Sequence, residues 1–220
     1  CSFIDDEIFT DIAKGLAEGA RQSEISISGG EVSQINEIIN GIDLIGACIG
    51  TIKLNQVNCG SGIVPGNHIV GLASSGIHSN GLTLARKVLL GETLQQQKIK
   101  VNEYSKTLGT TLGLELLTPT KIYVQELLQM MEEGINVKAM THITGGGFCN
   151  LNRVFSDNIR FVLNDLPEPL PIFQLIQETG EVSIAEMHQV FNMGVGMCII
   201  VENADDANRA KAISQKYGTQ

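Results

Sequence analysis

Two glycine-rich segments constrain the fold more than any other feature of this sequence. Residues 74–81 read SSGIHSNG and residues 141–147 read THITGGG, and each stands between a run typical of a strand and a run typical of a helix. A helix begins with unpaired N–H groups and the positive end of its dipole, and glycines let a backbone approach an anion closely. The pattern predicts a layered fold in which each loop is a candidate anion site, although turns of this kind without a ligand are also common.

The remaining periodicity predicts strands and helices in alternation, which indicates an α/β fold or, more narrowly, a two-layer α+β fold. The expected helices cover residues 6–23, 82–90, 120–133, 183–191 and 205–215, with Ala207, Ala210 and Ile213 of the last facing the core. The expected strands cover residues 25–27, 44–52, 68–73, 137–143, 159–163 and 197–201, and residues 91–113 are typical of an elaborated loop.

A stretch rich in Asn, Gly and Ser at residues 55–66 is the best candidate for a domain boundary. We therefore expect two domains, residues 1–56 and residues 57–220, and a chain of 220 residues is long enough for both. The chain begins without a methionine and leads at once into a helix, so we expect it to be a piece of a longer polypeptide.

Charge and composition argue against several classes of function. The formal net charge is −9 without a basic cluster, which argues against a nucleic-acid partner. No apolar run approaches the roughly 18 residues that a membrane helix needs. The five cysteines are odd in number and form no C-x-x-C pair, so a reducing cytoplasm fits best. Cys48 and Cys198 stand in apolar runs and are expected to be buried small hydrophobic residues.

His78 and Glu31 are the ionisable side chains with the most suggestive neighbours. His78 lies among Ser, Asn and Gly, so we expect it to be accessible to solvent and able to act near neutral pH; an exposed turn residue is the alternative. Glu31 follows Gly29 and Gly30 and could hold Mg²⁺ together with substrate phosphates; a capping or solvated glutamate is the alternative. His142 is expected to be structural, through a hydrogen bond to the loop that follows it.

Four ordered motifs resemble one enzyme family. They are GLASSGIHSNGLTLARKVL at residues 71–89, LTPTKIYV at residues 117–124, HITGGGF at residues 142–148 and EMHQVFNMGVGM at residues 186–197, and an ISGGE that ends at Glu31 precedes them. Motifs of this length and order are specific. Over nearly its whole length the chain resembles the aminoimidazole ribonucleotide synthetase family, the phosphoribosylformylglycinamidine cyclo-ligases.

The resemblance implies a fold, a reaction and a set of partners. The fold is the tail of an N-terminal domain that binds ATP and forms a homodimer, joined to most of a C-terminal α/β domain. In the reaction, which belongs to purine biosynthesis, ATP activates the formyl amide oxygen of formylglycinamidine ribonucleotide. A neighbouring nitrogen then closes the imidazole ring, and ADP and phosphate leave. The implied cofactors are ATP and Mg²⁺, and this chain alone is expected to be inactive.

The resemblance also implies roles for individual residues. His78 is the candidate for proton transfer or for steadying the activated amide. Glu31, with Gly29 and Gly30, would face the nucleotide, and Glu31 would also bind Mg²⁺. The residues that would bind the substrate come from both loops, with the second cradling the ribose phosphate; they are Ser74, Ser75, Gly76, Ser79, Asn80, Thr144, Gly145, Gly146 and Gly147.

One stretch departs from the pattern of the family. In residues 32–36 the second acid and the proline that usually follow Gly-Gly-Glu are replaced. Two alternatives therefore stay open. The parent protein could be another phosphate-transfer enzyme of the same superfamily, or a non-catalytic binding module that depends on a partner.

Overall fold

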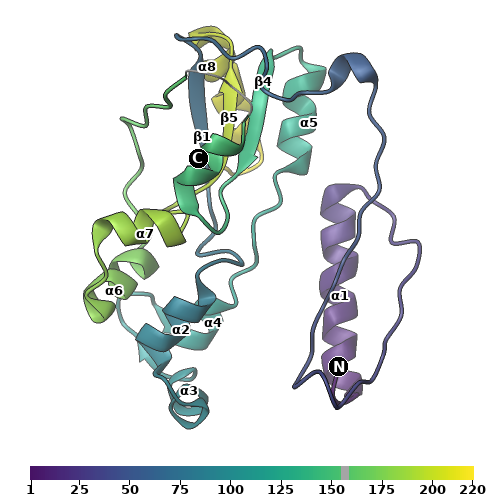
Figure 1. Cartoon of the computed structure of the whole chain (residues 1–220), viewed down its shortest axis with the longest axis vertical. Helices are drawn as coiled ribbons and strands as arrows, with labels where there is room; N and C mark the ends of the chain where they lie inside the picture. Colours follow the sequence, from purple (N-terminus) through teal and green to yellow (C-terminus); the bar gives the residue numbers. More distant parts are fainter. Residues whose placement is uncertain (155–158) are drawn as a thin grey trace. The chain divides into compact units, whose positions relative to one another are not determined.

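The computed structural model describes residues 1–154 and 159–220, which divide into two units, Cys1–Val57 and Asn58–Gln220. Strands and helices are both present, which confirms the mixed α/β class (Figure 1). No helix in the described ranges is long and apolar enough to cross a membrane.

The main element of the first unit is the expected helix, α1 (Asp6–Ser23), and a 3₁₀ turn, η1 (Leu54–Gln56), lies near the end of the unit. The Asp5 side chain begins α1 by accepting hydrogen bonds from two N–H groups of the first turn. No residue of this helix is buried, and its Leu16 is 53% exposed.

Three expectations for the first unit are wrong. Residues 25–27 and 44–52 form no strand, and Cys48 is exposed rather than buried. A strand needs a partner for its N–H and C=O groups, and no described residue of this unit forms a ladder with these segments.

A three-stranded antiparallel sheet organises the second unit (Figure 1). Across the sheet the strands are β1 (His68–Ala73), β5 (Val195–Val201) and β4 (Val137–His142), so three of the four strands expected for this region are confirmed. β5 is the central strand. Its sequence, VGMCIIV, is almost continuously apolar because both of its faces are covered.

Helices α5 (Val124–Glu132) and α8 (Ala204–Lys216) cover one face of the sheet. Burial of apolar surface between these layers stabilises the fold by roughly 25 cal/mol for each Å² removed from water. The buried side chains of this layer are Val70, Leu72, Tyr123, Met130, Ile135, Ile199, Val201, Ala207, Ala210 and Ile213, which confirms the core-facing residues expected in the last helix.

The opposite face of the sheet is covered by the 3₁₀ helix η2 (Gly147–Arg153) and by residues 159–163. Alternate side chains of this segment, Ile159, Phe161 and Leu163, pack on the sheet. Their period of two therefore reflects burial on one side. The segment pairs with no strand among the described residues, so the strand expected there is wrong.

A group of helices continues the core beyond one end of the sheet (Figure 1). Phe173 and Phe191 lie at its centre, each 0% exposed, with their rings 5.9 Å apart. The helices around them are α2 (Leu82–Leu90), α4 (Leu112–Leu116), α6 (Pro171–Gly180) and α7 (Ile184–Val190). The Ser183 side chain caps α7, as the capping pattern predicts.

Residues 91–113 have more regular structure than the sequence predicts. They contain helix α3 (Leu94–Lys100), a hairpin of β2 (Tyr104–Ser105) and β3 (Thr110–Thr111), and the start of α4. A reciprocal capping box between Thr93 and Gln96 begins α3. Because α3 buries no residue, it has no apolar period by which the sequence could reveal it.

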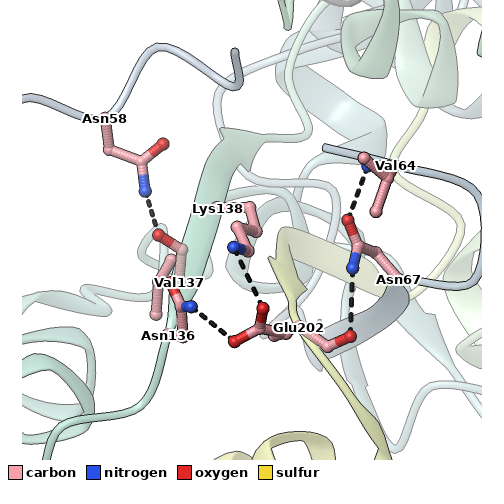
Figure 2. A network of polar contacts seen from close by, with 7 residues as sticks. All are labelled: Asn58, Val64, Asn67, Asn136, Val137, Lys138 and Glu202. Atoms are coloured by element: carbon pink, nitrogen blue, oxygen red, sulfur yellow. Dashed lines mark hydrogen bonds and ion pairs between the residues drawn. The ribbon is translucent and has the colours of Figure 1, made fainter. Parts of the chain in front are cut away.

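A polar network fastens the segment that precedes β1 to the end of β5 (Figure 2). Asn67 accepts a 2.8 Å hydrogen bond from the N–H of Val64 and donates a 3.0 Å bond to the carbonyl oxygen of Glu202. The Glu202 carboxylate accepts from the Asn136 amide at 2.6 Å and pairs with Lys138 at 3.5 Å. The hydrogen bond from Asn136 and then the charge of Lys138 hold the pKa of Glu202 below its usual value.

This network predicts that Asn67→Ala lowers the free energy of unfolding by about 1–2 kcal/mol, because two hydrogen bonds of roughly 1 kcal/mol each are lost. Urea unfolding of the whole chain would measure the change. Asn102→Ala is the matched control, since Asn102 is exposed outside the network. Equal effects of the two substitutions would show that the network does not stabilise the sheet.

Candidate functional site

The topology of the sheet brings both glycine-rich loops to one edge. β1 and β4 each run antiparallel to β5, so they run parallel to each other and their last residues lie at the same edge. The serine loop (residues 74–81) follows β1, and the triple-glycine loop (residues 144–147) follows β4. Residues 191–194, which lead into β5, come to the same edge between them.

Asn192 holds the start of the serine loop. This side chain is 3% exposed. Its Oδ1 accepts from the Ser74 hydroxyl at 2.8 Å and from the N–H of Gly194 at 2.9 Å, and its Nδ2 donates to the carbonyl oxygen of Gly76 at 2.9 Å. The N–H of Ser74 also donates to the carbonyl oxygen of Gly194 at 2.8 Å. The loop is thus bound to the segment before β5 through both side chain and backbone.

His78 is buried within the serine loop, so the expectation of a solvent-accessible histidine is wrong. It is 4% exposed and has a left-handed φ of 57°. Its Nε2 accepts from the N–H of Ser75 at 3.2 Å and from the N–H of Lys121 at 3.5 Å, while its buried Nδ1 has no partner among the described residues. Burial, and then the nearby His142, lower the pKa of His78 to about 4. The ring is therefore neutral at pH 7 and carries its hydrogen on Nδ1.

Three rings pack where the two loops leave the sheet. His78, Tyr123 and His142 have centroids 6.2–6.5 Å apart in every pair. Gly196 of β5 makes room for them, because a Cβ there would overlap the Tyr123 hydroxyl and lie 2.6 Å from the His78 ring. His142 forms no hydrogen bond to the following loop within the described residues, so that expectation is wrong; burial lowers its pKa.

The serine loop also explains why α5 begins later than residue 120, where the sequence predicts it. The residues before α5 bind the loop and β1 instead of continuing the helix. Ser75 donates to the carbonyl oxygen of Pro119 at 2.7 Å, and Tyr123 donates through its hydroxyl to the carbonyl oxygen of Ala73 at 2.8 Å. Helix α5 starts only at Val124.

Asn150 holds the triple-glycine loop in the same way. This side chain is 2% exposed. Its Oδ1 accepts from the N–H of Thr144 at 3.0 Å and from the Thr144 hydroxyl at 2.8 Å, and its Nδ2 donates to the carbonyl oxygen of Gly145 at 3.1 Å. Gly146 and Gly147 have positive φ values of 103° and 54°, which side chains disfavour. A Cβ at Gly147 would overlap the carbonyl oxygen of His188.

The two loops face each other closely. A Cβ at Gly145 would lie 3.2 Å from Oδ1 of Asn80, so these residues approach across the gap between the loops. Phe191 connects both loops, since its ring lies against Gly81 and its carbonyl oxygen would be 3.1 Å from a Cβ at Gly147.

Backbone donors at this edge are free to bind a ligand. The exposed Gly145 and Gly146 have N–H groups that donate to no other described residue, and the N–H groups of residues 79–81 likewise find no acceptor among the described residues. Successive N–H groups in such turns form a concave anion site. The edge therefore carries N–H groups from both loops that no described residue accepts.

The predicted substrate residues differ in how they can contribute. Ser75 and Ser79 are exposed, and the Ser79 hydroxyl lies 2.9 Å from that of Thr120. Ser74 and Gly76 are buried, and the Ser74 hydroxyl is bound to Asn192, so these two shape the loop. The sequence motifs did not single out Asn150 and Asn192 as the residues that hold the two loops, although Asn192 stands in the FNMGVGM motif at residues 191–197.

Gly29, Gly30 and Glu31 lie in the other unit, in an exposed segment without helix or strand. Their binding of nucleotide and metal stays a prediction. Within the described ranges no group of three or more His, Cys, Asp or Glu side chains could hold a metal ion. The described residues therefore do not make a metal site by themselves.

Comparison with known proteins identifies the family. A family model described as AIR synthase related protein, C-terminal domain, matches residues 64–220. Phosphoribosylformylglycinamidine cyclo-ligases from Methanocaldococcus jannaschii and Methanococcus maripaludis strain C7 are each 45% identical over 97% of this chain. The protein of that name from Methanothermobacter thermautotrophicus is 42% identical over 95% of the chain. The chain spans 59%, 59% and 60% of the lengths of these relatives. It therefore belongs to the AIR synthase related family, as the four motifs predict, and residues 64–220 match the C-terminal domain of that family.

Proposed function

We propose that the protein to which this chain belongs closes the imidazole ring of formylglycinamidine ribonucleotide in purine biosynthesis, with ATP converted to ADP and phosphate. One observation carries the proposal: two glycine-rich loops with free backbone donors meet at a single edge of the sheet. The name of the relatives, phosphoribosylformylglycinamidine cyclo-ligase, agrees with such a site.

The triple-glycine loop would bind the phosphate of the ribonucleotide. Gly145 and Gly146 are exposed, their N–H groups are free, and positive φ at Gly146 and Gly147 curves the loop. Backbone donors attract a dianion through local N–H groups, which suits a chain whose formal charge is −9. The guanidinium of Arg153, which donates to the carbonyl oxygen of Gly145 at 3.5 Å, would add a positive charge beside this loop. Thr144 would act through its bond to Asn150, since its hydroxyl already donates there.

The serine loop would bind the reacting part of the substrate. Ser75, Ser79 and Asn80 supply side-chain hydroxyl and amide groups, and residues 79–81 supply N–H groups. Phosphoryl transfer and ring closure depend mainly on positioning and on electrostatic stabilisation, so a rigid wall of donors suits both.

The first role of His78 would be to hold the serine loop in shape from its centre. Its neutral ring accepts two backbone N–H groups, and protonation at Nε2 would break both bonds. Proton transfer by His78 stays a prediction and would require the loop to open around the ring. The other predicted role, steadying the activated amide, would use the N–H at Nδ1; because this atom is buried, it too would require the loop to open.

The remaining partners are proposed for the whole protein. ATP and Mg²⁺ would bind through Gly29, Gly30 and Glu31 together with parts of the protein that this chain does not contain. Residues 1–56 would belong to the N-terminal domain, which would form the homodimer. A reducing cytoplasm is supported by the five cysteines, all of which are free thiols in the described residues.

The proposed phosphate site predicts that Gly146→Ala weakens binding of formylglycinamidine ribonucleotide at least roughly tenfold, which corresponds to about 1.4 kcal/mol. A Cβ at Gly146 would strain a φ of 103° and lie 2.8 Å from Nδ2 of Asn150. Isothermal titration calorimetry with this chain would measure the affinity, with inorganic phosphate as a competitor.

Gly134→Ala is the matched control, because Gly134 also has a positive φ but stands in open space after α5. Its affinity should equal that of the unchanged chain. If the unchanged chain binds neither the ribonucleotide nor phosphate, the assignment of both loops fails. Binding without turnover in the full-length protein would instead favour a non-catalytic module.

The environment of His78 predicts a neutral ring with hydrogen on Nδ1 from pH 8 to pH 5, protonated only around pH 4. Nitrogen-15 NMR of the imidazole would show this, with His78→Gln to assign the signal. Because the pKa in the unfolded chain is about 6.5, the unfolded state binds more protons between about pH 6.5 and pH 4. Stability should therefore fall as the pH drops through that window. Titration near pH 6.5 would contradict the buried arrangement.

A further inference from the structure

Two buried asparagines form the same hydrogen-bond pattern in the two loops. In each, Oδ1 accepts one backbone N–H and one hydroxyl, and Nδ2 donates to a carbonyl oxygen near the loop glycines. For Asn192 the hydroxyl belongs to Ser74 and the carbonyl to Gly76; for Asn150 they belong to Thr144 and Gly145. The two residues come from different elements, the segment before β5 and the helix η2.

We propose that Asn192 and Asn150 are positioning residues that set the shape of the ligand site, each through the donor and acceptor of one side-chain amide. The identity of the ligand rests on the proposed function, whereas the geometry of the two amides does not. In each side chain the oxygen and the nitrogen of the amide already form hydrogen bonds within the protein. Neither asparagine therefore has a free polar atom with which to bind the ligand directly. Each therefore acts through its loop.

The pattern restricts the residue type. An amide places an acceptor and a donor on one planar group, whereas a carboxylate has acceptors only and a hydroxyl is too short to reach both sides. Asn192 and its partners in Ser74, Gly76 and Gly194 are buried, so water cannot replace a bond that is lost there. Asn150 is itself 2% exposed, but its partner Gly145 is exposed and also accepts from Arg153 at 3.5 Å, so the cost of a lost bond is smaller in that loop.

The segment that carries Asn192 links the two loops. Met193 and Gly194, the next two residues, have left-handed φ values of 49° and 98°, which turn the chain sharply into β5. The preceding residue, Phe191, lies against Gly81 of one loop and Gly147 of the other. A change in the bonds of Asn192 would therefore disturb the triple-glycine loop as well as its own.

The test uses Asn192→Asp and Asn150→Asp, which keep the shape of the side chain. An ionised carboxylate sets an oxygen against the glycine carbonyl that Nδ2 now binds, and the two repel. A protonated carboxyl can donate to that carbonyl and restore the bond, and burial raises the pKa of such a group. Ribonucleotide affinity relative to the unchanged chain should fall at least about tenfold at pH 8 and recover towards parity at pH 5.

The comparison with the unchanged chain at each pH removes the titrations of His78, His142 and the ligand phosphate. The cationic Arg153, which donates to the carbonyl oxygen of Gly145 at 3.5 Å, is present in both chains. Asn152→Asp is the matched control, because Asn152 lies two residues after Asn150 and is exposed. The ratio of its ribonucleotide affinity to that of the unchanged chain should stay at one at both pH values. A loss that is the same at pH 8 and pH 5, or no loss at all, would overturn the proposal.

A second readout needs no ligand. In ¹H–¹⁵N spectra, the amide signals of residues 74–76 in Asn192→Asp should move towards those of the unchanged chain as the pH falls. If the unchanged chain binds no ribonucleotide but these signals recover, the proposed function fails and the positioning role holds. If the aspartate variants do not fold, Ser74→Ala removes one bond of the same amide. It should weaken binding and shift the same signals, and unchanged affinity and signals would overturn the proposal.

Discussion

The arrangement of the two loops depends on the hydrogen bonds of the Asn192 side-chain amide. This amide lies in the turn into the central strand β5, and it binds the start of the loop that follows β1. A buried amide with one partner missing costs about 1–3 kcal/mol, so the bound arrangement is strongly preferred over a loosened one. Asn150 applies the same chemistry to the loop that follows β4. The sheet thus sets where the loops begin, and the two amides set their course.

In the proposed site, backbone N–H groups rather than side chains would bind the ligand. Side chains that could have faced the ligand, such as the hydroxyls of Ser74 and Thr144, are used inside the loops. Glycines then permit the close approach of the loops to each other at Gly145 and Asn80. An acidic chain can hold an anion under these conditions, because local N–H groups rather than net charge supply the attraction. His78 is likewise used inside the loops, since its buried neutral ring accepts hydrogen bonds from the N–H groups of Ser75 and Lys121.

Sequence patterns predicted much of the second unit for clear physical reasons. β1, β4, β5 and α8 have strong periodicity because each buries a continuous apolar face. The segments at residues 44–52 and 159–163 have similar patterns but no ladder partner among the described residues, and a single sequence cannot supply the partner. The burial of His78 was hidden by its polar neighbours, because Tyr123 and His142, which enclose it, are distant in sequence. For the same reason the roles of Asn150 and Asn192 could not be inferred: each depends on a loop that only the fold brings near.

The proposed function requires the two loops to form one ligand site. A titration of the ¹⁵N-labelled chain with formylglycinamidine ribonucleotide tests this through the amide signals of the loop glycines and their neighbours. The signals of Gly145, Gly146 and residues 77–80 should shift together and give a single dissociation constant. Shifts confined to one loop, or separate constants for the two loops, would contradict it.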